Sequence, residues 1–229
     1  MLVLFDGSNG TGKSTVISAL ADAVAHHGNK DLTIHVHRTP GHRSELSKLL
    51  RELLVEQTDP RAPKTEWTRR ALYLADAADY WANNRVVCES KDHLVLLDRS
   101  HHSTLAYGMF FGLSVVELQA LMKVSDMACP MRPDLYIYMT CDLEVCMRRL
   151  SARAAKNKDV YLAKASDMHQ LAINYDYTLG MLPSSWNMPR TVDTTGLTPG
   201  QMVMACKTQI WQSLGIFLET STAQAPTTT

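Results

Sequence analysis

Short apolar segments alternate along this chain with longer segments in which the apolar residues have helical spacing. The short runs predict strands, because strands are roughly four to eight residues long and rich in aliphatic and aromatic residues. The longer segments place apolar residues three and four positions apart, which predicts amphipathic helices. The predicted strands cover residues 2–5, 32–37, 93–98, 135–139 and 191–193. The predicted helices cover approximately 15–24, 45–56, 65–87, 114–124 and 142–152, a segment ending near 181, and a last helix from 198.

This alternation of strands and helices predicts an α/β fold with a mostly parallel, five-stranded sheet and helices on both faces. Because neither a repeat nor a linker interrupts the pattern, residues 1–218 are predicted to form one domain. Residues 219–229 are rich in Ser, Thr, Ala and Pro, which predicts a disordered tail. Ligands of such sheets bind beyond the carboxyl ends of the strands, so Gly7, Asp98 and the segment after Val36 are expected at one rim.

The overall composition narrows the class of partner. Of the 229 residues, 45% are apolar, and 23 basic residues balance 23 acidic ones. A net charge of zero gives no general attraction to nucleic acid or to a membrane surface, so anion binding is expected to be local. Five scattered cysteines without a C-x-x-C pair favour free thiols in a reducing compartment. Because no signal-peptide pattern or membrane-length apolar run is present, a cytoplasmic location is expected.

The most specific motif is G-x-x-x-x-G-K-[ST] at residues 7–14, here called the phosphate loop. It stands between a predicted strand and a predicted helix, which is the context in which glycines expose backbone N–H groups to phosphate oxygens. Lys13 is expected to reach the β- and γ-phosphates of ATP, and the Ser14 hydroxyl to ligate Mg²⁺. The residues expected to bind ATP are Gly7, Ser8, Asn9, Gly10, Thr11, Gly12, Lys13, Ser14 and Thr15.

Asp98 and Arg99 follow a continuous apolar strand and form the second candidate element of the site. A carboxylate at such a strand end helps to hold Mg²⁺ in proteins with a phosphate loop, although an Asp there can also cap the next helix. Arg99 favours a bound phosphate, because a guanidinium binds phosphate with two hydrogen bonds; the alternative is an ion pair with a carboxylate.

A basic cluster supplies the third candidate element. Arg149 and Arg153 are four residues apart on a predicted helix and therefore share one face. Phosphoryl transfer needs positive charge on the moving group, and a mobile basic segment closing over the phosphates would supply it. The alternative is a solvated helix end, whose cations suit the helix dipole.

With these residues in place, the chain resembles the thymidylate kinase family over roughly residues 1–215. The phosphate loop, the segment from Thr39 to Leu54, the run Asp98-Arg99-Ser100 with the following Ala106-Tyr107, and the run from Pro133 to Arg149 are similar to that family's motifs. The resemblance implies a P-loop kinase fold and transfer of the γ-phosphoryl group of ATP to a deoxynucleoside 5′-monophosphate. It also implies Mg²⁺ as cofactor, a homodimer, and a short lid at about 153–160.

The resemblance also assigns roles to individual residues. Lys13, Asp98, Arg99, Arg149 and Arg153 would be the catalytic residues, with Arg153 at the start of the lid. Ser14 and Asp98 would hold Mg²⁺. Arg99 would bind the 5′-phosphate of the acceptor. The residues expected to bind the acceptor are Asn9, Arg43, Arg51, Tyr73, Ala77, Arg99 and Tyr107. For Tyr73, which lies on the long helix, packing in the core is the alternative to stacking on a base.

Four departures from the family pattern fall on the acceptor side. Asn9 stands in place of Asp, Thr39 of Glu, Ala77 of the base-contacting Arg, and Ser100 of Tyr. One hydrogen bond to a base edge is worth roughly 1–3 kcal/mol, which is enough to redirect a preference. These residues lead to the hypothesis that phosphoryl transfer is retained while acceptor preference has moved from dTMP toward a related or modified pyrimidine deoxynucleotide.

Two other functions fit the same motifs. The Asp98-Arg99-Ser100 run also resembles deoxynucleoside kinases, in which a carboxylate acts as general base for a nucleoside 5′-hydroxyl. A non-catalytic nucleotide-binding switch is the third possibility, because acceptor residues are altered. The two kinases differ in whether the acceptor carries a 5′-phosphate, and a switch would hydrolyse ATP without an acceptor.

Overall fold

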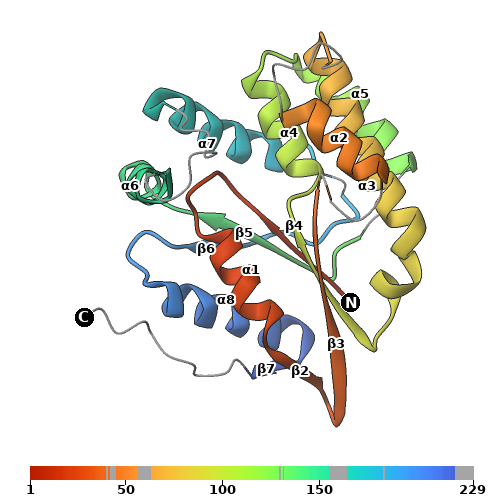
Figure 1. The fold of residues 1–229 in the computed structure, drawn as a ribbon, viewed down its shortest axis with the longest axis vertical. Helices are drawn as coiled ribbons and strands as arrows, with labels where there is room; N and C mark the ends of the chain where they lie inside the picture. The colour runs from red at the N-terminus through yellow and green to blue at the C-terminus, as the bar shows by residue number, and fades with distance from the viewer. Residues whose placement is uncertain are drawn as a thin grey trace.

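A seven-stranded sheet forms the centre of the computed structural model, with strand order β6-β5-β1-β4-β3-β2-β7 (Figure 1). The structure describes residues 1–39, 41, 45–55, 63–128, 130, 132–154, 164–182 and 184–219. The strands are β1 (Leu2–Asp6), β2 (Val24–His27), β3 (Lys30–Arg38), β4 (His93–Asp98), β5 (Leu135–Thr140), β6 (Arg190–Asp193) and β7 (Ile216–Glu219). The helices are α1 (Lys13–Ala21), α2 (Glu45–Val55), α3 (Glu66–Glu89), α4 (His101–Phe110), α5 (Val115–Ala128), α6 (Leu143–Ala154), α7 (Ala165–Leu179) and α8 (Pro199–Leu214).

The five strands expected from the sequence form a parallel block, but the sheet has seven strands, so the predicted strand number is wrong. The block β6-β5-β1-β4-β3 is parallel throughout. Strands β2 and β7 extend it in antiparallel pairing. The extension follows from packing, since Ala25, Ile216 and Leu218 bury their side chains in the same core as the parallel strands. Gly28, with φ of +62°, makes the turn between β2 and β3.

Helices cover both faces of the sheet, as predicted, with α1 and α8 on one face and α3, α4 and α7 on the other (Figure 1). On the first face, Val16 and Leu20 of α1 and Ile210 of α8 pack against the strands. On the second, Trp81 of α3 and Tyr175 of α7 do so. Strand β1 is buried on both faces, which explains its continuous apolar sequence.

Two local predictions differ from the structure. The helix expected over 15–24 ends at Ala21, and Val24 begins β2, because its neighbour Ala25 is buried in the sheet core. Helix α4 was not among the predicted elements. It begins after Ser100, whose side chain caps it by accepting a hydrogen bond from the His102 N–H at 3.1 Å.

The expectation of one shared rim is confirmed. Strands β1, β3 and β4 run parallel and end at Asp6, Arg38 and Asp98, with Arg38 and Asp98 in register. The phosphate loop and Arg99 therefore start from the same edge of the sheet. Most of the predicted lid, from residue 155, and the tail from residue 220 lie outside the described residues. In the described part of the chain, no helix has the length and apolar character needed to cross a membrane.

Candidate active site

The phosphate loop requires glycine at defined positions. Gly7, Gly10 and Gly12 have φ values of +136°, +85° and +95°, which side-chain-bearing residues rarely adopt. A Cβ atom on Gly7 would lie 2.1 Å from the Met139 carbonyl oxygen, and one on Gly10 would lie 2.8 Å from that of Cys146. The loop thus passes directly over the end of β5 and the start of α6, and leads into the amino terminus of α1.

Lys13 is the first residue of α1, and its side chain is folded back onto the loop. Its Nζ donates hydrogen bonds to the carbonyl oxygens of Gly7 and Ser8, both at 2.7 Å. The side chain is buried, and this burial, assisted by the nearby Arg99 guanidinium, lowers the pKa of Lys13 to about 7. A bound triphosphate would replace the carbonyl oxygens as the partner of the ammonium group and would favour its charged form.

Asp98 ends β4 beside the loop, with a carboxylate that is incompletely used by the protein. Its Oδ2 lies 3.7 Å from Nε of Arg38, while the buried Oδ1 has no hydrogen-bond partner among the described residues. A buried carboxylate oxygen without a donor is costly unless a cation or water occupies the position next to it. Ser14, whose side chain is exposed, lines the same cleft. A hydroxyl and a carboxylate are the oxygen ligands that Mg²⁺ prefers, so these residues fit that ion.

Arg99 lines the same cleft as Lys13, and three side chains fix its guanidinium. Its guanidinium donates to Asn9 Oδ1 at 2.6 Å, to Ser103 Oγ at 3.0 Å and to Tyr175 Oη at 3.1 Å. The Tyr107 ring centroid lies 5.5 Å from its Cζ. Arg99 is therefore placed by groups on the phosphate loop, α4 and α7. Sequence reasoning found Arg99 and Tyr107 but not Ser103 or Tyr175.

Arg149 projects from α6 toward the loop and is held by backbone carbonyl groups. Its guanidinium donates to Gly10 O at 3.2 Å, to Thr194 O at 2.8 Å and to Leu197 O at 3.3 Å. It also donates to the hydroxyl of Thr194 at 3.1 Å. These bonds fasten the phosphate loop to the segment after β6. Arg153, one turn further along α6, is exposed at the same cleft.

Of the remaining residues predicted on the acceptor side, Tyr73 and Ala77 lie on α3. Tyr73 lies with its ring 4.9 Å from Cζ of Arg70, a buried arginine that forms an ion pair with Glu66. Ala77 is buried, two turns beyond Arg70 on the same helix. Arg43, and the side chain of Arg51, lie outside the described residues.

Asp76, next to Ala77, anchors the segment after β3. Its carboxylate accepts hydrogen bonds from the Ser47 hydroxyl at 2.6 Å and from the Gly41 N–H at 3.1 Å. Burial raises the pKa of Asp76, and these two donors partly offset that effect. The altered residue 77 thus lies beside a contact that fixes how α2 meets α3. The sequence analysis singled out Ala77 but did not predict this role of Asp76.

Residues of the phosphate loop and the Asp98-Arg99 pair line one cleft of about 490 Å³. Of the predicted acceptor residues, Asn9 and Arg99 line it, whereas Tyr73, Ala77 and Tyr107 are not among its lining residues. Its wall combines the phosphate loop and Lys13 with Asp98 and Arg99 at the end of β4, and with Arg149 and Arg153 of α6. Five cationic side chains line this cleft together with the Asp98 carboxylate, whose Oδ1 has no hydrogen-bond partner among the described residues: Lys13, Arg38, Arg99, Arg149 and Arg153. This arrangement suits two phosphate-bearing ligands and a divalent cation, because each anion finds a guanidinium or an ammonium group at close range.

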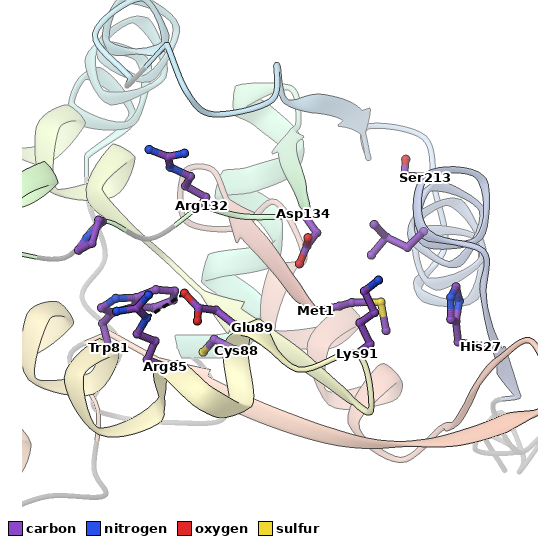
Figure 2. A pocket seen from close by; sticks show the side chains of 12 residues that line it. Met1, His27, Trp81, Arg85, Cys88, Glu89, Lys91, Arg132, Asp134 and Ser213 are labelled. Atoms are coloured by element: carbon purple, nitrogen blue, oxygen red, sulfur yellow. Dashed lines mark hydrogen bonds and ion pairs between the residues drawn. The ribbon is translucent and has the colours of Figure 1, made fainter.

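A second cavity, of about 690 Å³, contains none of the predicted site residues (Figure 2). It lies at the opposite edge of the sheet, where the Met1 ammonium donates to the His93 carbonyl oxygen. Arg85 is paired with Glu89 at 2.9 Å, and Asp134 accepts a hydrogen bond from the Leu2 N–H. These polar groups are already partnered within the protein, so the chemistry of phosphate transfer is concentrated in the first cleft.

Comparisons with known proteins agree with the geometry of the first cleft. A family model described as thymidylate kinase matches residues 5–180. A thymidylate kinase of Bacillus licheniformis is 27% identical over 192 residues, covering 82% of this chain and 86% of the relative. One of Trichodesmium erythraeum is 31% identical over 163 residues, covering 66% and 71%. The solved structure of a thymidylate kinase from Candida albicans has a TM-score of 0.64 at 20% identity, over 92% of this chain and 91% of that chain, and shows the same fold.

Proposed function

The chain belongs to the thymidylate kinase family, and we propose that its cleft binds ATP and a deoxynucleoside 5′-monophosphate head to tail. The γ-phosphoryl group of ATP passes to the 5′-phosphate of the acceptor and gives the diphosphate and ADP. The observation that carries this proposal is the single cleft lined by both Lys13 and Arg99. One anion-binding group comes from the phosphate loop and the other from the end of β4, and Asp98 lines the same cleft.

The donor side is built from the loop and from α6. Backbone N–H groups of the phosphate loop and the amino terminus of α1 bind the phosphates of ATP. Lys13 leaves the carbonyl oxygens of Gly7 and Ser8 and binds the β- and γ-phosphate oxygens. Arg149 holds Gly10 in place, while Arg153 supplies positive charge at the moving phosphoryl group. No covalent intermediate is needed, because positioning and charge account for the catalysis.

Mg²⁺ is proposed as the cofactor, held by the Ser14 hydroxyl and by the Asp98 carboxylate, directly or through water. When bound, the ion would neutralise charge on the β- and γ-phosphates. The unsatisfied Oδ1 of Asp98 supports this position.

On the acceptor side, the Arg99 guanidinium binds the 5′-phosphate and Tyr107 lines the nucleoside pocket. Because a monophosphate is already ionised, it needs no general base, and this leaves Asp98 free for the cation. Family membership favours dTMP as the acceptor. Asn9 and Ala77 lack the charged groups that the family pattern has there, so we propose that related or modified pyrimidine deoxynucleotides are also accepted.

Steady-state ADP release tests the proposal and separates its alternatives. With ATP and Mg²⁺, we expect release that depends on dTMP or on another pyrimidine deoxynucleoside monophosphate. Turnover of thymidine or deoxycytidine instead would support a nucleoside kinase. Release without any acceptor would support a nucleotide-binding switch. The predicted homodimer is a separate proposal, and light scattering of the purified chain tests it.

A further inference from the structure

The Asp6 carboxylate is fully buried at the carboxyl end of β1, one residue before the phosphate loop. It accepts hydrogen bonds from the Gly7 and Ser100 N–H groups, at 3.0 and 3.1 Å, and from the Ser100 hydroxyl at 2.7 Å. It also accepts from the hydroxyls of Ser103 and Tyr175. A buried carboxylate needs several donors to offset its lost hydration. Asp6 therefore connects β1 with α4 and α7.

The hydroxyls of Ser103 and Tyr175 stand between this carboxylate and the Arg99 guanidinium. Nη1 of Arg99 lies 3.0 Å from Ser103 Oγ and 3.1 Å from Tyr175 Oη. A carboxylate only accepts hydrogen bonds and a guanidinium only donates them. The hydroxyl protons are therefore directed toward Asp6 or toward each other, and the oxygen lone pairs receive the arginine N–H groups.

This arrangement fixes which part of the guanidinium is left for a ligand. Nη1 donates to the hydroxyls of Ser103 and Tyr175, and Nη2 donates to Asn9 Oδ1. Of the five N–H groups of an arginine, the Nε–H and the second Nη2–H make no hydrogen bond within the described ranges of the chain. The nitrogens Nε and Nη2 lie on one edge of the planar guanidinium. That edge is the fork which binds two oxygens of one phosphate.

The main chain of Arg99 is fixed as well. Its φ is +75°, a left-handed conformation that costs a non-glycine residue about 1–2 kcal/mol. The Arg99 N–H donates to Phe5 O at 2.9 Å, and its carbonyl oxygen accepts from the Thr39 hydroxyl at 3.2 Å. Such strain persists only where the surroundings determine the conformation, and it is frequent at ligand sites.

We propose that Tyr175 is a positioning residue for phosphoryl transfer, whose hydroxyl, anchored on Asp6, turns the free edge of the Arg99 guanidinium toward the acceptor phosphate. Burial, together with the charge of Asp6, raises the pKa of Tyr175 well above its ordinary value. The hydroxyl therefore stays neutral and keeps both its donor and its acceptor functions. This inference rests on the proposed function, because it assigns Arg99 to the acceptor.

The variant Tyr175→Phe removes the hydroxyl and keeps the ring. Because Arg99 loses one of three partners, we expect the acceptor KM and the acceptor Kd to rise by about tenfold, as for the loss of a hydrogen bond to a charged group. The KM for ATP is expected to change less than about twofold. Ser103→Ala, which removes the second hydroxyl, is expected to act in the same direction.

Tyr138→Phe is the matched control. Tyr138 packs against Tyr175, with ring centroids 6.0 Å apart, but its hydroxyl donates to Asp176 at 3.0 Å and not to Arg99. If Tyr175 acts only through packing, both variants will change the melting temperature alike and leave the acceptor KM unchanged. We expect the acceptor KM to rise in Tyr175→Phe and to stay within about twofold in Tyr138→Phe.

Two measurements keep this test separate from that of the proposed function. Calorimetric titration with dTMP reports acceptor binding, and ADP release reports turnover. If the wild-type protein turns over dTMP and Tyr175→Phe has the same acceptor KM and Kd, the role of Tyr175 is overturned, while the kinase assignment stands. Binding of dTMP without turnover would contradict the kinase, while weaker binding by Tyr175→Phe would still support the positioning role.

Discussion

Arg149 of α6 donates a hydrogen bond to the Gly10 carbonyl oxygen at 3.2 Å, so a helix side chain holds the phosphate loop from outside. The same guanidinium bonds to Thr194 and Leu197, which follow β6. A residue expected from its charge to act on the transferred group thus also shapes the loop that binds it. Positive charge and loop geometry are supplied together by one side chain.

The variant Arg149→Ala is expected to weaken ATP binding, with a rise in the KM for ATP of about tenfold, because Gly10 loses an external partner. Unfolding free energy is expected to fall by about 1–3 kcal/mol, since several carbonyl groups lose their donors. Steady-state kinetics and thermal unfolding measure the two effects. Arg148→Ala, at the exposed neighbouring position, is the control. Equal behaviour of the two variants would show that only surface charge matters.

Gly7→Ala is expected to destabilise the protein by more than about 2 kcal/mol. The added Cβ would meet the Met139 carbonyl oxygen at 2.1 Å, and the φ of +136° is unfavourable for alanine. Thermal unfolding should show a melting temperature lower by several degrees. Gly196→Ala places its Cβ in open space and should stay within about 0.5 kcal/mol of the wild type. A Gly7→Ala variant as stable as the control would contradict the described loop conformation.

ATP binding is expected to take up protons above pH 7. Burial and Arg99 lower the pKa of Lys13 to about 7 in the ligand-free protein, and the triphosphate charge should raise it again. The ammonium form is the one that binds, so ATP affinity should fall by up to about tenfold per pH unit above 7. Calorimetry at pH 8 in buffers of different ionisation enthalpy measures the uptake. Lys13→Met should abolish it, and buffer-independent heats in the wild type would exclude this role.

Asp98→Asn is expected to raise the Mg²⁺ concentration needed for half-maximal turnover, and to lower kcat by about 100-fold. The amide keeps the size of the side chain but removes the negative charge that faces the cation. Activity measured across a Mg²⁺ series at saturating ATP checks this. The exposed Asp22, at the end of α1, provides the control Asp22→Asn. A Mg²⁺ dependence identical to the wild type in Asp98→Asn would remove Asp98 from the metal site.

The parts of the site that the sequence could predict are local in the chain. The phosphate loop, its flanking strand and helix, and the Asp98-Arg99 pair are each encoded within a few residues. Their common position also follows from the sequence, because parallel strands end at one edge of a sheet. The parallel block of the sheet was also predictable, because the continuous apolar runs of β1, β4 and β5 and the alternating pattern of β3 are typical of strands.

The parts that were missed depend on contacts distant in sequence. Tyr175 and Asp6 are 169 residues apart, and nothing in the local pattern around Tyr175 separates it from a core tyrosine. Strands β2 and β7 are four residues each and pair with one another across most of the chain. A usable signal was present for β2, because Gly28 and Asn29 form a two-residue turn between two runs of strand character.

The most direct test of the account is transfer of a labelled γ-phosphate from ATP to dTMP by the purified chain in the presence of Mg²⁺. We expect the label to appear in dTDP, with one ADP formed for each dTDP, and not in inorganic phosphate. In a parallel reaction with thymidine in place of dTMP, we expect no labelled thymidine monophosphate. In Lys13→Met the transfer should disappear while the melting temperature is preserved. Label found only in inorganic phosphate, or only in the product of the thymidine reaction, would contradict the account.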